Sequence, residues 1–226
     1  MDIDAQEQVS WHFETFPRQT KKAFDFLSAQ DWIYDSQWYL AGGTALALQA
    51  GNRKSVDLDF FTEKSSFDEN RLLSHFLENK DWKTTFNEEG TIYGELFGAK
   101  ISFIAYPFFL PKQIPLRYGS IRVLDPIDIA VMKVIAISQR GRKRDFFDLY
   151  WCAQHLEPLE KTVRRLKEQY PTVAHDYNHI LKSIVYFEDA ESDPMPEISF
   201  PADWKKVKDF FRKEIPKITT TIIGLE

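Results

Sequence analysis

Two aspartates separated by one residue are the first feature of this chain that could carry chemistry. Asp57 and Asp59 lie in a largely apolar segment, residues 55–61, which is typical of a β-strand. Side chains alternate along a strand, so both carboxylates would point to one face. The opposite face would hold the apolar side chains Val56, Leu58 and Phe60. Two like charges side by side are unfavourable without a cation, and hard oxygen ligands suit Mg2+. The spacing therefore predicts a magnesium site on Asp57 and Asp59.

A glycine pair lies shortly before these aspartates. Gly42, Gly43 and Thr44 follow a short apolar strand at residues 38–41 and begin a helix-like run, residues 44–50. Backbone N–H groups at the start of a helix bind phosphate, and glycine allows a phosphate to approach them closely. A nucleoside triphosphate carrying Mg2+ would satisfy both the glycine pair and the carboxylate pair.

Residues 125–133 form the next candidate element. Asp125-Pro126-Ile127-Asp128 is typical of a helix start, with a capping Asp, Pro at the first position and an acid near the positive end of the dipole. Lys133 on such a helix would have only apolar neighbours at i±3 and i±4. Its ammonium must therefore extend to water or meet a phosphate or carboxylate, and the spacing leaves both interpretations open.

A short basic loop around a glycine, residues 139–145, separates this helix from the next. The loop is either a solvated turn or a contact for phosphate or an RNA backbone, with Arg140 as one of its cations. Asp145 and Asp148 would share one helix face, and Asp145 can be explained as an N-cap. Asp148 lies in an aromatic run and requires a cationic partner. Candidate partners are Lys133, Arg140 and Arg144.

The composition limits the class of protein. The 226 residues are 43% hydrophobic, enough for a folded core, and the net charge of −5 argues against a globally basic nucleic-acid binder. The single cysteine, Cys152, excludes an internal disulfide and a cysteine zinc site. No apolar run approaches the roughly 20 residues of a membrane span. Residues 1–7 are acidic and polar, unlike a secretory signal, so we expect a cytoplasmic protein that does not contact the membrane.

The pattern of elements changes near residue 125. Strands are predicted at residues 38–41, 55–61, 82–88, 91–97, 100–106 and 121–124. Helices are predicted at residues 18–30, 44–50, 126–139, 144–154, 158–169, 173–187 and 203–213. One more helix is expected to begin after Asp68, which would cap it. We therefore expect an α+β core at residues 1–124 and a helical portion at residues 125–226. Whether these are separate domains is left open by the sequence.

Two motifs in this order resemble those of one known family. Residues 42–48 followed by residues 55–61, and residues 128–133 followed by residues 140–150, are similar to the two signatures of the AbiEii/AbiGii-type nucleotidyltransferase toxins. A weaker match lies at residues 186–191. The resemblance implies a polymerase-β-like fold, that is, a mixed sheet with flanking helices and a helical portion that completes the cleft.

The resemblance also implies an activity and a set of roles. It implies a Mg2+-dependent enzyme that moves a nucleoside monophosphate from an NTP to an acceptor hydroxyl, such as a tRNA 3′ end, with a cognate antitoxin protein as partner. The triphosphate would be held by Gly42, Gly43 and Thr44, the Mg2+ by Asp57 and Asp59, and further contacts would come from Lys133, Arg140, Asp145 and Asp148.

The chain departs from the fold's usual pattern at two positions. Gly43 stands where a serine is common, and the adjacent Thr44 could supply the hydroxyl. Ser102 stands where a third carboxylate is usual, and a serine cannot act as the general base. Asp148 is then the favoured base, because its aromatic flanks would raise its pKa. The alternative is a catalytically inactive module of the same fold that binds a nucleotide or a partner.

Overall fold

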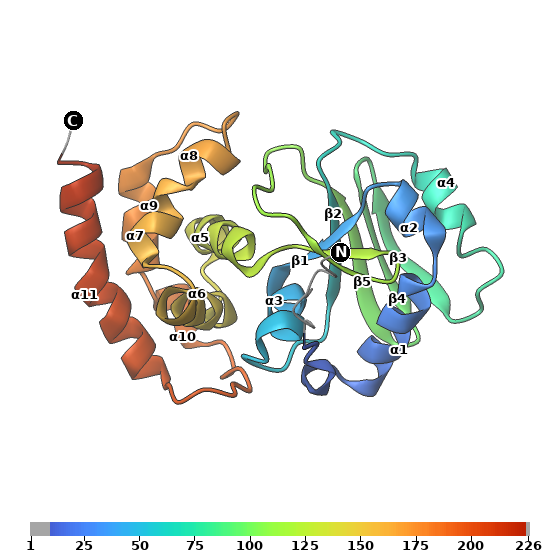
Figure 1. Cartoon of the computed structure of the whole chain (residues 1–226), viewed down its shortest axis with the longest axis horizontal. Coiled ribbons are helices and arrows are strands. Elements are labelled where there is room, and N and C mark those ends of the chain that lie inside the picture. The colour runs from blue at the N-terminus through green and yellow to red at the C-terminus, as the bar shows by residue number, and fades with distance from the viewer. Residues whose placement is uncertain (1–9, 225–226) are drawn as a thin grey trace, which may run out of the picture.

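The computed structural model describes residues 10–224, so the acidic segment at residues 1–7 lies outside the described part. Its strands form one seven-stranded mixed sheet in the order β3-β4-β5-β2-β1-β7-β6 (Figure 1). The strands are β1 (Tyr39–Ala41), β2 (Leu58–Thr62), β3 (Trp82–Glu88), β4 (Thr91–Leu96), β5 (Ala99–Ala105), β6 (Leu116–Tyr118) and β7 (Ile121–Val123). The central strand β2 runs antiparallel to β1 and parallel to β5.

The register of β2 gives the sheet a buried face and an open face. Leu58 and Phe60 are fully buried, as predicted, and Asp59 alternates with them on the other face. The prediction for Val56 is wrong: its side chain is 47% exposed. The strand begins only at Leu58, so Val56 lies in the extended segment before it, where its carbonyl accepts a hydrogen bond from the Thr20 hydroxyl.

Helices α1 (Arg18–Ser28), α2 (Asp31–Asp35) and α4 (Glu69–Ser74) cover the buried face (Figure 1). Aromatic rings fill the space between these helices and the sheet. Phe103 of β5 stacks on Phe60 with ring centroids 5.3 Å apart and also contacts Trp32 of α2. Asp68 caps α4 through the Arg71 N–H, as predicted. This packed layer fixes the strands, and it leaves the polar side chains of β2 and β5 on the other face.

Helix α3 (Gly42–Ala50) follows β1 directly and lies between the sheet and the helical portion (Figure 1). That portion contains α5 (Pro126–Arg140), α6 (Lys143–His155), α7 (Leu159–Arg164), α8 (Leu166–Gln169), α9 (Tyr177–Ile184), α10 (Glu188–Glu191) and α11 (Trp204–Ile222). Helix α5 begins as predicted, with the Asp125 carboxylate accepting the Ile127 N–H. Helices α5 and α6 both contact α3. The predicted α+β fold, with a mixed sheet followed by helices, is confirmed.

The ends of two predicted helices differ from the structure. Helix α11 continues past the predicted end at residue 213 and includes Pro216, because the buried stripe of Val207 and Phe211 extends through Ile215 and Ile218. Helix α9 is shorter than predicted, since Asp176 caps it through the His179 N–H. The short elements α2, α10 and β6 were not predicted.

Candidate active site

A cavity of about 630 Å3 lies between the open face of the sheet and helix α5. We call it the central cavity. Most of the residues predicted as site residues line it, namely Gly42, Gly43, Thr44, Asp57, Asp59, Lys133, Arg140 and Asp145. Asp148 does not belong to this lining and is fully buried. The fold thus brings the two sequence motifs to one place, although more than 60 residues separate them along the chain.

Asp57 and Asp59 both line the central cavity, as predicted, but only Asp59 belongs to β2, because the strand begins at Leu58 and Asp57 lies just before it. Ser102 lies beside Asp59 on the neighbouring strand, and its hydroxyl donates a hydrogen bond of 2.6 Å to Asp59 Oδ1. Burial raises the pKa of Asp59, and the nearby charge of Asp57 raises it further. Asp57 Oδ2 lies 3.8 Å from the guanidinium of Arg144, and this pair is partly exposed. The two carboxylates therefore concentrate negative charge at one point of the cavity wall.

The donor set at this point fits a magnesium ion that a substrate completes. Within residues 10–224 no group of three or more His, Cys, Asp or Glu side chains is arranged to hold a metal. Mg2+ is commonly bound by one or two carboxylates together with substrate phosphates and water. The oxygens of Asp57 and Asp59 match that mode, whereas a cage built entirely from protein ligands is absent from the described residues.

The glycine pair is explained by two close approaches. Gly42 has φ +71°, a conformation that glycine tolerates best, and a Cβ there would lie 3.3 Å from Asp59 Oδ2. A Cβ at Gly43 would lie only 2.0 Å from Nη2 of Arg53. A serine at this position would require the Arg53 guanidinium, which is held by Asp148, to move. The hydroxyl of Thr44 is engaged with Ser55, 2.8 Å away.

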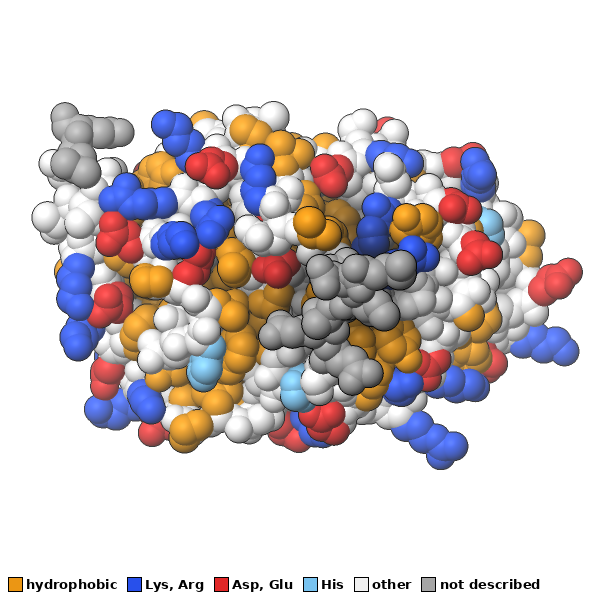
Figure 2. All heavy atoms as spheres, viewed as in Figure 1, with side chains coloured by type: hydrophobic (Ala, Val, Ile, Leu, Met, Phe, Trp, Pro, Cys, Tyr) orange, Lys and Arg blue, Asp and Glu red, His pale blue; other side chains and the backbone are white. Residues whose placement is uncertain are grey.

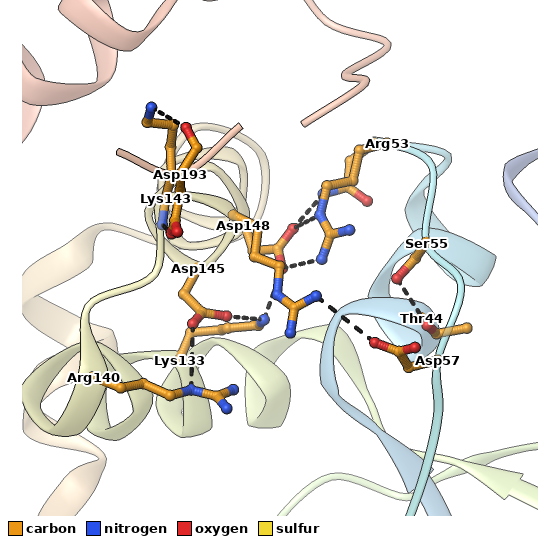
Figure 3. Close-up of polar contacts among 12 residues, drawn as sticks. Thr44, Arg53, Ser55, Asp57, Lys133, Arg140, Lys143, Asp145, Asp148 and Asp193 are labelled. Atoms are coloured by element: carbon orange, nitrogen blue, oxygen red, sulfur yellow. Dashed lines mark hydrogen bonds and ion pairs between the residues drawn. The ribbon is translucent and has the colours of Figure 1, made fainter. Parts of the chain in front are cut away.

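Arg53, Lys133, Asp145 and Asp148 form a buried ion cluster (Figure 3). Lys133 Nζ lies 2.6 Å from Asp145 Oδ1 and 2.8 Å from Asp148 Oδ2. Arg53 binds Asp148 with two parallel hydrogen bonds of 2.7 and 2.8 Å. Of the two interpretations that the sequence left open for Lys133, the structure shows contact with a carboxylate rather than extension to water. Burial alone would lower the pKa of Lys133, but the two carboxylates outweigh it and raise that pKa.

The expectation for Asp148 is wrong. Burial by its aromatic neighbours would raise its pKa, as predicted, but Arg53 and Lys133 together hold the pKa well below its usual range. A carboxylate so strongly stabilised in its charged form is a poor proton acceptor. It also lies behind the cavity wall rather than in it. Asp148 therefore positions Arg53 and Lys133, and it does not meet the requirements of a general base.

Asp145 does face the cavity, and one of its oxygens is free. Its Oδ1 accepts from Lys133, while its buried Oδ2 has no hydrogen-bond partner among the described residues. The N-cap interpretation is wrong, because α6 begins at Lys143 and Asp145 lies inside its first turn. Arg140 Nε is 3.9 Å from this oxygen, with a side chain that is 60% exposed.

The cations of the basic loop make two kinds of contact. Arg142 pairs with Asp193 at 2.7 Å, and the Lys143 ammonium donates to the carbonyls of Glu191 and Asp193. These two cations anchor the loop to the segment after α10. Arg140 and Arg144 instead line the central cavity, where an anion can reach them.

Arg53 is the site residue that sequence reasoning missed. It lies between the two parts of the first motif, in Gly51-Asn52-Arg53-Lys54. An arginine in such a segment is typical of an ordinary polar loop. The signal that could have found it is the need of buried Asp148 for a partner. Asn52 joins the same carboxylate, donating to Asp148 Oδ1 at 3.1 Å.

The mixed sheet, the carboxylate pair and the glycine turn together define a nucleotidyltransferase, and comparison with known proteins agrees. The family model described as "Nucleotidyl transferase AbiEii toxin, Type IV TA system" matches residues 25–91 and 92–221. The chain belongs to this family. The predicted family and enzyme class are thereby confirmed.

Three individual proteins that resemble this chain have sequence identities between 17% and 33%. An uncharacterized protein of Aquifex aeolicus (strain VF5) is 33% identical over 184 residues, covering 80% of this chain and 87% of the relative. The crystal structure of a putative nucleotidyltransferase from H. pylori has the same fold, with a TM-score of 0.53, 18% identity and coverage of 93% and 99% of the two chains. The MenT4 nucleotidyltransferase toxin of Mycobacterium tuberculosis H37Rv aligns with a TM-score of 0.48 and 17% identity over 90% and 86% of the chains. Among the described helices, none has the length and apolar character needed to cross a membrane.

Proposed function

We propose that the central cavity binds a nucleoside triphosphate with Mg2+ and transfers the nucleoside monophosphate to a hydroxyl of an RNA acceptor, such as a tRNA 3′ end. The observation that carries this proposal is the meeting of three groups in one cavity. The carboxylates of Asp57 and Asp59 lie there with the start of α3 and with the cation Lys133. A metal site, a phosphate site and a fixed positive charge are what this reaction requires.

The phosphates would lie against the first turn of α3. The N–H groups of Gly43 and Thr44 have no partner earlier in the helix, and they carry the positive end of its dipole. Asp57 and Asp59 would hold Mg2+, which supplies positive charge to the reacting phosphate when bound. Lys133, and Arg140 at the mouth of the cavity, would neutralise the charge that develops in the transition state.

The ion cluster would keep these charges in place before the nucleotide arrives. Asp148 accepts two hydrogen bonds from Arg53, of 2.7 and 2.8 Å, and forms an ion pair of 2.8 Å with Lys133, so neither cation has to be ordered at the moment of reaction. Asp145 would hold Lys133 and Arg140 in place from the cavity wall, since its Oδ1 accepts from Lys133 and its buried Oδ2 lies 3.9 Å from Arg140 Nε. Phosphoryl transfer depends largely on positioning and charge neutralisation, so a third carboxylate is not an absolute requirement.

Incubation of the protein with each labelled NTP, Mg2+ and total RNA tests this function. Label should enter RNA, and Asp59→Asn should abolish the transfer and weaken Mg2+-dependent nucleotide binding. Ser102→Ala, which removes only a hydroxyl beside Asp59, should change the transfer little. Unchanged transfer by the Asp59→Asn variant would refute the proposed site.

The alternative function is a catalytically inactive module that binds a nucleotide or a partner. Ser102 favours it, because the structure places this serine beside Asp59, where the fold usually carries its third acid. The same incubation separates the two functions. Binding of an NTP without transfer to RNA or to protein would support the module and refute the enzyme.

We also propose a cognate antitoxin as partner and the cytoplasm as location. Membership of a type IV toxin–antitoxin family supports the first. Co-expression with proteins encoded beside this chain, followed by purification of complexes, tests for an antitoxin. Fractionation of cells that express the chain tests the location.

A further inference from the structure

A row of four paired residues crosses the sheet from Asp59 to the edge strand β3, where the register shifts just before Phe86. Asp59 of β2 pairs with Ser102 of β5, Ser102 pairs with Tyr93 of β4, and Tyr93 pairs with Phe86 of β3. Side chains at directly opposite positions share one face of a sheet. The row therefore leads from the proposed metal site to an aromatic pair at the far edge of the sheet.

The aromatic pair is exposed although its rings are packed together. Tyr93 is 42% exposed and Phe86 37%, and their rings stack with centroids 5.1 Å apart at an angle of 27°. Tyr93 lines the central cavity. On the opposite face of the sheet, by contrast, Phe60 and Phe103 are fully buried. We call Tyr93 and Phe86 the aromatic platform. Tyr93 borders the proposed site, and Phe86 stacks on Tyr93 from the edge strand β3. The face of the Tyr93 ring that Phe86 does not cover is therefore the one that a base would stack on.

The geometry of the proposed transfer indicates which substrate lies over the aromatic platform. The start of α3, where the phosphates would bind, follows β1, and β1 and β5 flank β2 on opposite sides. In-line transfer requires the attacking hydroxyl to approach opposite to the departing pyrophosphate. The acceptor must then lie over β5 and β4. Two strand spacings put Tyr93 about 10 Å from β2, which leaves room for one terminal nucleotide.

We propose that the aromatic platform binds the acceptor as a single-stranded RNA end, with the bases that precede the terminal nucleotide stacked on Tyr93 and Phe86. This inference rests on the proposed function and names the site of its second substrate. Every base has a flat π-face, so stacking on aromatic side chains tolerates any sequence. Lys100 lines the cavity two residues before Ser102 on β5, on the same face of the sheet, and would reach the RNA backbone.

The charge distribution favours stacking as the main source of affinity. The chain has a net charge of −5, and Figure 2 shows Lys and Arg interspersed with Asp and Glu over the face in view. Next to the row, Glu95 lies between Lys83 and Lys100 on neighbouring strands. Because opposite charges alternate in this way, we expect weak attraction of phosphates near the platform, so that stacking on the exposed rings would contribute most of the affinity.

The test uses Tyr93→Ala, Tyr93→Phe and a control variant, Tyr186→Ala, whose ring is 54% exposed but does not line the cavity. Binding of a fluorescent single-stranded oligoribonucleotide is measured by anisotropy, and transfer is measured with labelled NTP. Tyr93→Ala should weaken oligonucleotide binding and raise the KM for RNA by about 5- to 100-fold. Mg2+–NTP affinity should stay unchanged, Tyr93→Phe should behave as wild type, and Tyr186→Ala should have no effect.

The outcomes separate this inference from the proposed function. If the wild type and Tyr93→Ala bind the oligonucleotide with equal affinity, the aromatic platform is not the RNA site. The same conclusion follows if the wild type does not bind the oligonucleotide. Transfer of label to a protein instead of RNA would overturn RNA as the occupant. If the wild type transfers nothing, the proposed enzyme fails, and the anisotropy titration alone still decides whether RNA binds to the platform.

Discussion

At the scale of single residues, Asp148 is the anchor of the buried ion cluster. We expect Asp148→Asn to lower the free energy of unfolding at pH 7 by about 3–5 kcal/mol, because it removes the partner of Arg53 and one partner of Lys133 in a buried site. Urea unfolding followed by circular dichroism measures the loss. The matched control is Asp209→Asn, which breaks an exposed ion pair with Lys205 and should change stability little.

The difference in unfolding free energy between wild type and Asp148→Asn should depend on pH. The pKa of Asp148 in the folded protein lies well below its ordinary value of 3.8. A group whose pKa is lowered by folding stabilises the protein above the unfolded pKa and loses that effect as the pH falls. The stability difference between wild type and Asp148→Asn should therefore be constant between pH 7 and about pH 5 and shrink below about pH 4. A difference that grows on acidification would contradict the depressed pKa.

Gly43 gives a second test at this scale. A Cβ at this position would meet the buried Arg53 guanidinium at 2.0 Å, so Gly43→Ala should destabilise the protein by about 1–3 kcal/mol. In the Arg53→Ala background the obstacle is gone, and alanine is the better helix former. The same change should then be neutral or stabilising. Equal costs in both backgrounds, measured by thermal unfolding, would show that Arg53 is not the reason for this glycine.

Residue types and spacing predicted a large part of the site. The part that they did not predict concerns one partner and the pKa of Asp148. The placement of Asp57, Asp59 and Lys133 in one cavity follows from strand and helix periodicity combined with a family resemblance. Lys133 was among the partners that the sequence suggested for Asp148, and the structure confirms it. The second partner, Arg53, lies 95 residues away along the chain and was not predicted. Together the two cations lower the pKa of Asp148, so the predicted direction of its pKa shift was wrong.

At the scale of elements, the parallel pairing of β2 and β5 decides the chemistry of the metal site. It places Ser102 beside Asp59, so a single substitution can restore a third carboxylate. We expect Ser102→Asp to lower the melting temperature without metal, because three acids then face each other. Addition of Mg2+ should raise its melting temperature more than that of the wild type, since binding to the folded state stabilises it.

Two comparisons make this measurement specific. Ser74→Asp places a new carboxylate on the exposed end of α4 and should show the wild-type response to Mg2+. Asp59→Asn combined with Ser102→Asp should lose most of the added response. Equal Mg2+ shifts in all of these proteins would mean that the metal binds elsewhere.

Most elements were predicted to within a few residues, and the exceptions depend on packing. Alternation and turn glycines predicted β3, β4 and β5, and the Asp-Pro start predicted α5. The short strand β6 and the short helices α2 and α10 have too few residues for a periodic pattern. Their positions depend on neighbours, as β6 does on its pairing with β7.

At the scale of the whole molecule, the ion cluster joins the α+β core to the helical portion. Arg53 comes from the core and Asp148 from α6, and residues from both parts line the central cavity. We therefore predict that residues 1–124 and 125–226 unfold together as one cooperative unit. Trp38 and Trp82 report on the core, and Trp151 and Trp204 on the helical portion. Fluorescence and far-ultraviolet circular dichroism should give one coincident urea transition, and two separated transitions would contradict the prediction.

The most direct measurement of the proposed reaction compares NTP labelled at the α-phosphate with NTP labelled at the γ-phosphate. With Mg2+ and RNA, the wild type should place α-label in the RNA and release γ-label as pyrophosphate. Asp59→Asn should do neither, because it lacks a carboxylate for the metal beside the phosphate site. Entry of γ-label into RNA, or full transfer of α-label by Asp59→Asn, would contradict nucleotidyl transfer at Asp57 and Asp59.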